Sequence, residues 1–374
     1  MSLEIADEAA LRALERRAES FAWTRDVVSA AAPRVPFAER VDALESAMDD
    51  AGLLLADSSA LAKQLVTAIE AGHVVLQGPP GTGKTTVARI LAEVYSADLR
   101  VTTSTADWST YDVIGGLRPV DDGSFAPALG VVSEAVLACA ESVNTGAKKA
   151  TWLLIDEFNR ADIDKAIGPL YTVLSSNAPS HLLETPLELW FERSGRKELW
   201  VPTAFRIIAT MNDVDASYVN SLSQGLSRRF QFVSIGVAVD ETAVIAESEA
   251  ALSMARQRWS EVTGLSAVPG TPAIVTVLAN VLHAVRNPGG KVQWPLGTAQ
   301  IVDVWFSLLV QSDGDLSAVD LEALDICFAD TVTHQASNLS LNALKEMADV
   351  LRDYELSASE RAVRHLADAS STRF

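Results

Sequence analysis

Cysteine is rare in this chain, and so are the signals that would direct it out of the cytoplasm. Cys139 and Cys327 are the only cysteines in 374 residues, and their separation fits no metal-binding motif. A disulfide framework is therefore not expected, and both thiols should be buried in a reducing compartment. No apolar run reaches the roughly 18 residues of a membrane span, and residues 1–30 contain no apolar segment of a signal peptide. We expect a soluble, cytoplasmic protein that does not contact a membrane.

Basic residues are also few. The formal net charge is −19, from 49 acidic and 30 basic residues, and no run of basic residues exceeds two. A surface of this sign repels nucleic acid unless a basic groove forms locally, so contact with nucleic acid is expected only indirectly, through a partner. The hydrophobic content of 48% is that of a globular protein, which excludes extensive disorder.

The pattern of apolar residues divides the chain into three parts. Residues 1–55 have a helical period, which predicts a helical N-terminal extension that either caps the next domain or docks a partner. Residues 56–236 alternate helical segments with short apolar strands, which is typical of a parallel sheet covered by helices on both faces. The strands are expected at residues 73–77, 99–105, 151–157 and 205–212. Residues 237–374 lack strand patterns and predict four or five amphipathic helices.

Two insertions interrupt the alternation of strands and helices. One, at about residues 106–130, contains several glycines and predicts a loop with tight turns. The other, at about residues 186–202, predicts a hairpin that turns at Ser194 and Gly195.

A glycine-rich stretch, GPPGTGKTT, follows the first expected strand and precedes a helix. It matches the phosphate-binding pattern G-x-x-x-x-G-K-[ST], with the lysine at Lys84, and the alternative is a chance glycine turn. Backbone N–H groups of such a loop surround phosphate oxygens, and the helix N-terminus adds its positive dipole end. We expect Lys84 to contact the β- and γ-phosphates and Thr85 to bind Mg²⁺ through its hydroxyl. The residues predicted to bind the nucleotide here are Gly78, Pro79, Pro80, Gly81, Thr82, Gly83, Lys84, Thr85 and Thr86.

Two carboxylates follow the third expected strand directly. In a site with a phosphate loop, an aspartate at the end of a buried strand binds the metal, and Asp156 fits that description. Glu157, the next residue, is predicted to orient the attacking water. Phosphoryl transfer depends mainly on positioning and charge stabilisation, which these residue types supply. We therefore predict that Thr85 and Asp156 bind the metal, that Asp156 also binds the nucleotide, and that Glu157 is catalytic. Without the phosphate loop, the two acids would indicate only the end of a strand.

Three further polar residues are catalytic candidates. Asn212 ends the fourth expected strand and could hold the same water, unless it is an ordinary turn residue. Arg228 and Arg229 precede a phenylalanine, and either they end a solvated helix or one of them is an arginine finger donated in trans to a neighbour's nucleotide. The sequence does not decide between the two arginines, and a finger in trans requires an oligomer.

The ordered set GPPGTGKT, LLIDEFNRAD, IIATMN and LSRRF resembles the motifs of AAA+ ATPases. This resemblance implies an α/β fold, with a P-loop parallel-sheet AAA+ core, a helical N-terminal extension and an all-α C-terminal lid. Within AAA+ proteins, DEFNRA looks like the D-E-x-N-R-A of the dynein-related/MoxR branch. The two insertions also fit that branch, whose members use them around a central pore or for partner contact.

The first insertion resembles the McrB-like restriction NTPase motor subunits most closely, through Tyr111, Asp112 and the run GGLRP at 115–119. The resemblance implies ATP and Mg²⁺ as cofactors. Residues 211–217 depart from the M-N-T-A-D-R-S of McrB proper, and this leaves GTP open. A sensor arginine is expected in the lid but is missing from residues 294–303, and Arg286 is the nearest candidate.

The residues after the acidic pair leave several roles open. Asn159 could cap the following helix. Arg160 could reach a neighbouring subunit, or pair with Asp162 or Asp164.

The resemblance implies a homo-oligomer, a hexameric ring that hydrolyses ATP and drives a separate effector or client protein. In one hypothesis the partner is a nuclease, in a McrB-like DNA restriction or antiviral defence system. In the alternative the chain is a MoxR-type remodelling or metal-insertion chaperone with a von Willebrand-type partner. A third hypothesis, a scaffold that rarely hydrolyses nucleotide, is disfavoured by Glu157. No lysine follows an acid by two residues, as a common nuclease core requires, and no D-x-S-x-S metal site occurs, so either partner would be another chain.

Overall fold

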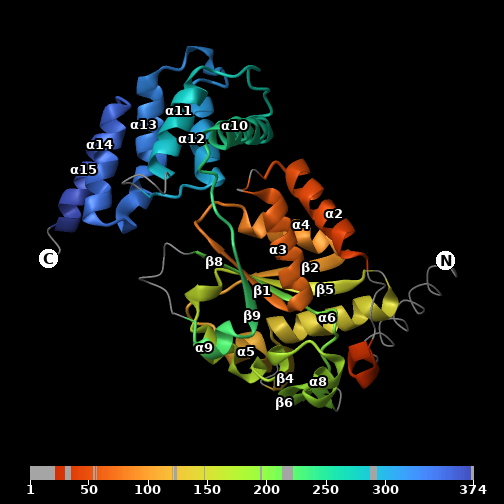
Figure 1. Ribbon diagram of the computed structural model, residues 1–374. Coiled ribbons are helices and arrows are strands. Elements are labelled where there is room, and N and C mark those ends of the chain that lie inside the picture. Colours follow the sequence, from red (N-terminus) through yellow and green to blue (C-terminus); the bar gives the residue numbers. More distant parts are fainter. Residues whose placement is uncertain are drawn as a thin grey trace. The chain divides into compact units, whose positions relative to one another are not determined.

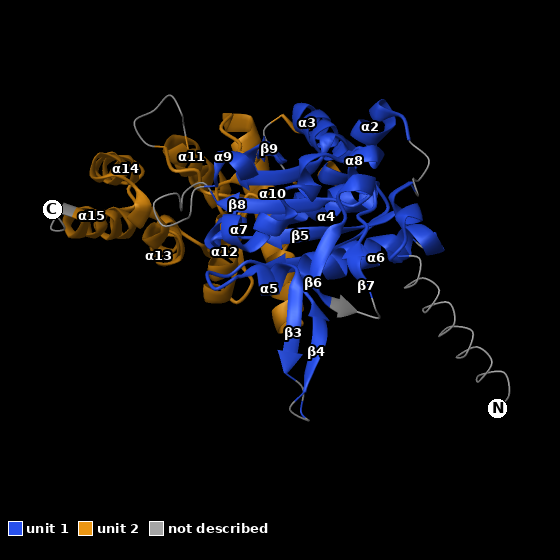
Figure 2. Ribbon diagram, turned by 90° about the horizontal axis from the view of Figure 1, so that it is seen from below, with its two compact units in different colours: residues 1–48, 59–77, 85–234 blue, residues 49–58, 78–84, 235–374 orange. Residues whose placement is uncertain are grey.

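The computed structural model describes residues 22–29, 35–53, 55, 57–119, 121, 124–146, 148–193, 196–212, 222–286 and 293–371. Most of the helix expected near the N-terminus, the turn at Ser194 and Gly195, and residues 213–217 lie outside the described residues. The chain forms two compact units (Figure 2). Unit 1 comprises residues 1–48, 59–77 and 85–234, and unit 2 comprises residues 49–58, 78–84 and 235–374. Residues 49–58 and the phosphate loop at residues 78–84 therefore belong to the same unit as the C-terminal helices. The sequence pattern did not predict this grouping.

The centre of unit 1 is a five-stranded sheet with the strand order β2-β5-β8-β1-β9 (Figure 1). Its strands are β1 (His73–Gly78), β2 (Ala97–Thr103), β5 (Ala150–Asp156), β8 (Ile207–Asn212) and β9 (Phe230–Ser234). β2 pairs in parallel with β5, β5 with β8, and β1 with β9. β5 is buried along its length up to Asp156, as expected for a central strand covered on both faces. The parallel sheet predicted from the sequence is confirmed.

One strand was not predicted. β9 has only five residues, and its burial alternates irregularly because Gln231 and Phe232 are exposed. A strand this short, directly after a polar segment, gives a weak periodic signal. Its pairing with β1, in the register His73 with Phe230, is a tertiary contact that the sequence pattern does not reveal.

A buried histidine joins two strands of this sheet. The Nδ1 atom of His73 accepts a hydrogen bond from the backbone N–H of Ile207 at 2.9 Å. Burial, together with the nearby Arg206 guanidinium, lowers the pKa of His73 to about 3. The ring is therefore neutral at physiological pH, and its nitrogen remains an acceptor between β1 and β8.

Helices cover both faces of the sheet. Figure 1 shows α3 (Ser58–Ala71) and α4 (Lys84–Val94) on one side and α6 (Val131–Thr145) on the other. α2 (Phe37–Asp50) buries Val41, Leu44 and Met48 along one face, in agreement with the helical period of that segment. The shorter helices are α5 (Thr110–Val113), α7 (Ile163–Ile167), α8 (Pro179–Glu184) and α9 (Gln224–Ser227), with 3-10 turns η1 (Arg25–Ser29), η2 (Phe158–Arg160), η3 (Gly168–Leu170) and η4 (Val173–Ser175).

Both insertions form antiparallel hairpins. β3 (Gly115–Pro119) pairs with β4 (Phe125–Leu129), where the sequence predicted a loop with tight turns (Figure 2). β6 (Leu187–Arg193) pairs with β7 (Arg196–Leu199). The Trp190 indole N–H donates to the Gly115 carbonyl at 2.9 Å and so links the two hairpins. A side chain at Gly116 would overlap the rings of Tyr111 and Trp190, so this close packing requires glycine.

Unit 2 is helical. Within residues 235–286 and 293–371 it has six α-helices, one more than the upper limit expected: α10 (Glu241–Thr263), α11 (Ile274–Arg286), α12 (Thr298–Gln311), α13 (Leu321–Thr331), α14 (Leu341–Asp353) and α15 (Ser357–Ser371). The 3-10 turns η5 (Leu316–Ala318) and η6 (Thr333–Asn338) separate neighbours in this series. The side chains of Asp240, Asp320 and Ser340 accept the N-terminal N–H groups of α10, α13 and α14. These N-caps fix where the three helices begin, which the apolar periodicity of the sequence did not resolve.

Both cysteines are free and buried, as predicted. Burial raises the pKa of Cys139 to about 12 and that of Cys327 to about 11, so both remain thiols. Across the described part of the chain, no helix combines the length and the apolar composition needed to cross a membrane.

Arg286 lies in the core of unit 2. Its side chain is fully buried, and its guanidinium pairs with Glu247 of α10 and donates to the carbonyls of Ala238 and Leu296. The guanidinium also donates to Glu247 Oε1 at 3.2 Å, and the Thr298 hydroxyl donates to the same oxygen at 2.6 Å. These contacts join α10, α11 and α12. Arg286 therefore acts as a structural ion pair, and its guanidinium is not available as the sensor arginine considered above.

Replacing Arg286 with alanine should destabilise the protein strongly, because the Glu247 carboxylate would stay buried without its partner. We expect a loss of about 3–5 kcal/mol in the free energy of unfolding, measured by urea denaturation. Arg352→Ala is the matched control, because Arg352 pairs with Asp349 on the surface with 55% of its side chain exposed, and little change is expected. Equal, small effects of the two substitutions would contradict the structural role of Arg286.

Candidate functional site

The phosphate loop connects β1 to α4. Gly81 and Gly83 have φ angles of +76° and +82°, in the left-handed region that glycine tolerates and other residues rarely adopt. The Lys84 ammonium donates to the carbonyls of Gly78 at 2.9 Å and Pro79 at 2.7 Å, and only 7% of Lys84 is exposed. The Thr82 hydroxyl also donates to the Pro79 carbonyl, at 3.0 Å. The loop thus folds around the lysine that the motif assigns to the phosphates.

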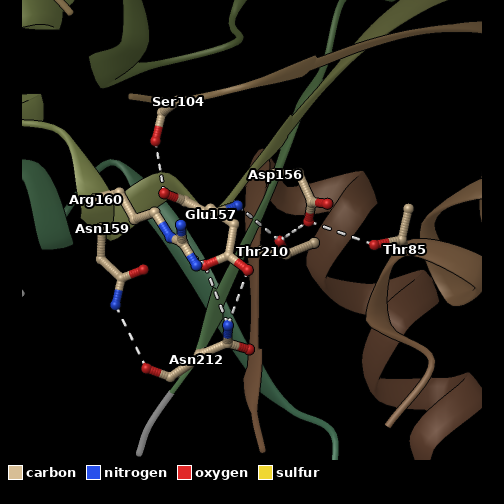
Figure 3. A network of polar contacts seen from close by, with 8 residues as sticks. All are labelled: Thr85, Ser104, Asp156, Glu157, Asn159, Arg160, Thr210 and Asn212. Atoms are coloured by element: carbon tan, nitrogen blue, oxygen red, sulfur yellow. Dashed lines mark hydrogen bonds and ion pairs between the residues drawn. The ribbon is translucent and has the colours of Figure 1, made fainter. Parts of the chain in front are cut away.

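The other residues predicted to bind the nucleotide differ in how far they are exposed to solvent. Pro79 is buried, whereas Pro80 is exposed. Thr86 is exposed on the first turn of α4. Thr85, by contrast, is half-buried and points toward Asp156 (Figure 3).

Asp156 lies at the end of β5 and contacts Thr85, the other residue predicted to bind the metal. The Thr85 hydroxyl donates to its Oδ1 atom at 3.3 Å. A hydroxyl and a carboxylate are hard oxygen donors of the kind that Mg²⁺ prefers, and Mg²⁺ takes its other ligands from water and phosphate. In the described part of the chain, no cluster of three or more histidine, cysteine, aspartate or glutamate residues could hold a metal without such help. The donor set therefore fits a magnesium ion shared with a nucleotide.

Glu157 adopts an unusual backbone conformation immediately after the strand. Its φ and ψ are 56° and 41°, in the left-handed region, which is strained for a residue other than glycine. This conformation turns the Glu157 carboxylate away from that of Asp156 and toward β8 (Figure 3). The Asn212 side-chain amide donates to both carboxylate oxygens, at 3.0 and 3.1 Å. The structure thus brings together two of the residues predicted to be catalytic.

Two hydroxyl residues hold the acidic pair, and sequence reasoning gave them no role. The Thr210 hydroxyl donates to Asp156 Oδ1 and accepts the backbone N–H of Glu157 at 3.2 Å. The Ser104 hydroxyl donates to the Glu157 carbonyl at 2.5 Å, and the Ser104 N–H donates to the Asp156 carbonyl at 2.9 Å. Ser104 follows the last residue of β2, and Thr210 lies within β8. Both strands pair with β5, so the register of the sheet brings these hydroxyls to the acidic pair, and the sequence pattern alone does not single them out (Figure 3).

The capping role suggested for Asn159 and the pairing of Arg160 with Asp162 or Asp164 need correction, whereas contact of Arg160 with a neighbouring subunit stays a prediction. Asn159 is buried in η2, and its amide donates to the Asn212 carbonyl at 3.4 Å instead of capping α7. The Arg160 side chain pairs with Glu157 at 3.1 Å and not with Asp162 or Asp164. Because η2 follows the strained turn at Glu157 directly, both side chains face back toward the site (Figure 3).

The two candidate finger arginines differ in their surroundings. Arg229 Nε donates to the Tyr171 carbonyl at 2.6 Å, Nη1 donates to the Gly225 carbonyl, and the guanidinium lies 4.5 Å from the centre of the Tyr171 ring. Arg228 is exposed at the end of α9. Arg229 is thus engaged by residues of its own chain, whereas the side chain of Arg228 is exposed to solvent.

Removing the Thr210 hydroxyl should impair catalysis without unfolding the site. In Thr210→Val, Asp156 loses a donor and the Glu157 N–H loses its acceptor, so we expect nucleoside triphosphate turnover to fall about tenfold or more. Thr210→Ser keeps the hydroxyl and should retain most of the activity. Steady-state phosphate release measures both variants, and equal activity of Val and Ser would show that the hydroxyl is unimportant.

A cavity of about 430 Å³ lies elsewhere in unit 1. Its walls include Arg40, Tyr95, Trp152 and Arg206, together with Ala150 at the start of β5. None of the predicted site residues contributes to it. Since Asp156 ends the strand that Ala150 begins, this cavity is not the phosphate site.

Comparison with known proteins agrees with this geometry. Residues 73–230 match the family model of the AAA domain of the dynein-related subfamily. The chain is 30% identical over 168 residues to the type IV methyl-directed restriction enzyme EcoKMcrB subunit of Escherichia coli K12, a match of 44% of this chain and 35% of that protein. It is 44% identical over 52 residues to the Holliday junction branch migration complex subunit RuvB of Borreliella burgdorferi, which covers 14% and 15% of the two chains. The chain therefore spans about a third or less of the length of these relatives.

The family match, the parallel sheet and the phosphate loop point to the same class of nucleotide-hydrolysing proteins. The match begins at the first residue of β1 and ends at the first residue of β9, so it contains the phosphate loop, the acidic pair and the candidate arginines. We conclude that residues 73–230 are an AAA domain of the dynein-related subfamily, with a McrB-like pattern and the α/β P-loop fold of an AAA+ NTPase.

Proposed function

We propose that this protein hydrolyses ATP with Mg²⁺ and uses the reaction to drive or regulate a separate protein. The observation that carries the proposal is the contact between Glu157 and Asn212 beside the Asp156–Thr85 pair. A carboxylate held by a neutral amide, next to a pair of metal-binding oxygens, suits the orientation of a water for attack on a phosphate.

Each residue has a distinct part in the proposed reaction. Lys84 binds the β- and γ-phosphates together with the backbone N–H groups of the loop. Thr85 and Asp156 hold Mg²⁺, which neutralises phosphate charge when bound. Glu157 orients the attacking water and takes up its proton, and Asn212 fixes the Glu157 carboxylate.

We further propose that the protein works as a homo-oligomeric ring in which Arg228 completes the site of a neighbouring subunit. Its exposed position at the end of α9 supports this role, and the contacts of Arg229 to Tyr171 argue for a structural role of that residue. A guanidinium supplied in trans stabilises charge on the transferred phosphoryl group.

A mixing experiment tests the role of Arg228. Arg228→Ala and Glu157→Gln should each be nearly inactive alone, because each lacks one half of every site. Mixed in equal amounts, they should recover up to about a quarter of wild-type turnover, because random assembly places an intact site next to an intact arginine at about one interface in four. Recovery with Arg229→Ala but not with Arg228→Ala would assign the finger to Arg229, and no recovery with either would contradict a finger in trans.

The biological role that we favour is the NTPase of a McrB-like DNA restriction or defence system in the cytoplasm. One of the two relatives is a subunit of a restriction enzyme and the other is a subunit of a Holliday junction branch migration complex, which supports this hypothesis over a MoxR-type chaperone. The net charge of −19 supports indirect contact with DNA, through a partner chain. Isolation of the native complex tests the role: a co-purifying nuclease supports it, and a von Willebrand-type partner would favour the chaperone instead.

A further inference from the structure

The first turn of α12 packs against the phosphate loop inside unit 2. The backbone N–H of Ala299 donates to the Gly81 carbonyl at 3.1 Å. A Cβ atom at Gly297 would lie 2.5 Å from both the Pro80 carbonyl oxygen and the Gly81 carbonyl carbon, so only glycine allows this approach. The helix therefore contacts the loop through its backbone as well as through side chains.

Gln300 lies in this contact with its side-chain amide against the loop. Only 7% of the residue is exposed. Its Nε2 donates a long hydrogen bond to the Pro80 carbonyl, at 3.4 Å, and a second to Oε1 of Gln335, at 3.1 Å. Gln335 belongs to η6, so a single amide joins the phosphate loop to two helical segments.

The other end of the same amide has no hydrogen-bond partner among the described residues. The Gln300 Oε1 atom is buried and accepts no hydrogen bond from the described residues, and a methyl group at Gly81 would overlap it. A buried acceptor without a donor costs free energy, and such groups are uncommon unless they serve a function. Gln300 Oε1 can therefore accept a hydrogen bond from a donor that the described residues do not supply.

We propose that Gln300 is a positioning residue that couples the phosphate loop to the C-terminal helices. The proposal rests on the nucleotide-binding role of the loop argued above. Phosphates that bind the loop act on the Pro80–Gly81 peptide, and a shift of this peptide changes the contacts of Gln300. The change then reaches α12 directly and η6 through Gln335. Gln300 does this as a neutral group, at the place where the resemblance led us to expect an arginine.

Gln300→Glu gives the sharpest test because it keeps nearly the same shape and replaces the neutral amide with a group whose charge and hydrogen bonding depend on pH. When ionised, the carboxylate cannot donate to the Pro80 carbonyl or to Gln335, and it repels the phosphates; when protonated, it can donate again. We expect nucleotide affinity to be about tenfold or more below wild type at pH 8 and to approach wild type as the pH falls toward 5, since the reference pKa of glutamate is about 4.3 and burial raises it.

Three further variants, one control and two that remove the amide without adding charge, complete the test. Gln311→Glu makes the same chemical change at the exposed end of α12 and should follow wild type at every pH. Gln300→Leu removes the amide without adding charge and should raise KM for nucleotide with a smaller change in kcat, independently of pH. Adding Gln335→Leu to Gln300→Leu should cause little further loss, because both substitutions break the same connection.

The results separate this inference from the proposed function. Affinity is measured with a fluorescent ATP analogue as the ratio of variant to wild type at each pH. If wild type binds the analogue and Lys84→Ala does not, but both Gln300 variants match wild type, the coupling role is wrong and the proposed function stands. A constant loss for Gln300→Glu at all pH values also overturns the coupling role, because it indicates a packing defect. If wild type itself does not bind the analogue, both proposals fail.

Discussion

Glu157→Gln is expected to reduce ATP turnover by at least about 100-fold while leaving ATP binding nearly unchanged. The substitution removes the carboxylate that accepts the proton of the attacking water, and general base catalysis contributes about 10²–10⁴-fold to such reactions. Binding should persist because Lys84 and the loop remain intact, and the glutamine amide can still bond to Asn212. Phosphate release and equilibrium titration of ATP measure the two properties separately.

A matched substitution shows whether this effect is specific to the site. Glu188→Gln makes the same chemical change at an exposed position of β6 and should behave as wild type. Wild-type turnover in Glu157→Gln would remove Glu157 from the mechanism. Loss of both binding and turnover would instead show that Glu157 has a structural role at its strained turn.

Lys84→Ala is expected to weaken ATP binding by about 100-fold or more and, with it, to abolish turnover. Its ammonium is the buried cation around which the loop folds. A hydrogen bond to a charged group contributes about 1.5–3 kcal/mol, which corresponds to about 10–100-fold in affinity for each bond lost. Lys345→Ala, at an exposed position on α14, is the control and should have no effect.

Thermal unfolding gives an independent measurement for the lysine. A ligand that binds only the folded protein stabilises it by about 2.7 kcal/mol at 100 times its Kd. ATP should therefore raise the Tm of wild type and of Lys345→Ala but not that of Lys84→Ala. An equal rise in all three proteins would show that Lys84 does not contribute to binding.

The parts of the fold that were predictable are those with long or strongly patterned segments. Residues 152–155 of β5 are apolar and two acids follow them, so both the position of the strand and the carboxyl end of the sheet could be inferred. β9 was not predicted because its strand conformation depends on pairing with β1, about 155 positions earlier in the chain. The hairpin at β3 and β4 was expected as a loop because its glycines indicate turns, whereas Gly116 is in fact needed for packing under Tyr111 and Trp190.

The candidate site shows the same division. Asp156 and Glu157 were recognisable because two acids directly follow a strand, and Asn212 because it ends a neighbouring strand. Thr210 and Ser104 could not be singled out, because their importance comes from the register that places them beside the acids. Closeness in sequence suggested Asp162 or Asp164 as the partner of Arg160, but its side chain pairs with Glu157.

The central claim is that this AAA domain hydrolyses ATP at the site formed around Asp156 and Glu157, with Mg²⁺ held by Thr85 and Asp156. Its most direct test is the rate of phosphate release from ATP by the purified wild-type protein, measured with Mg²⁺ and again after EDTA is added. We predict turnover that saturates with ATP, stops with EDTA and is restored by excess Mg²⁺. Absence of turnover with Mg²⁺, or turnover that EDTA does not affect, would contradict the claim.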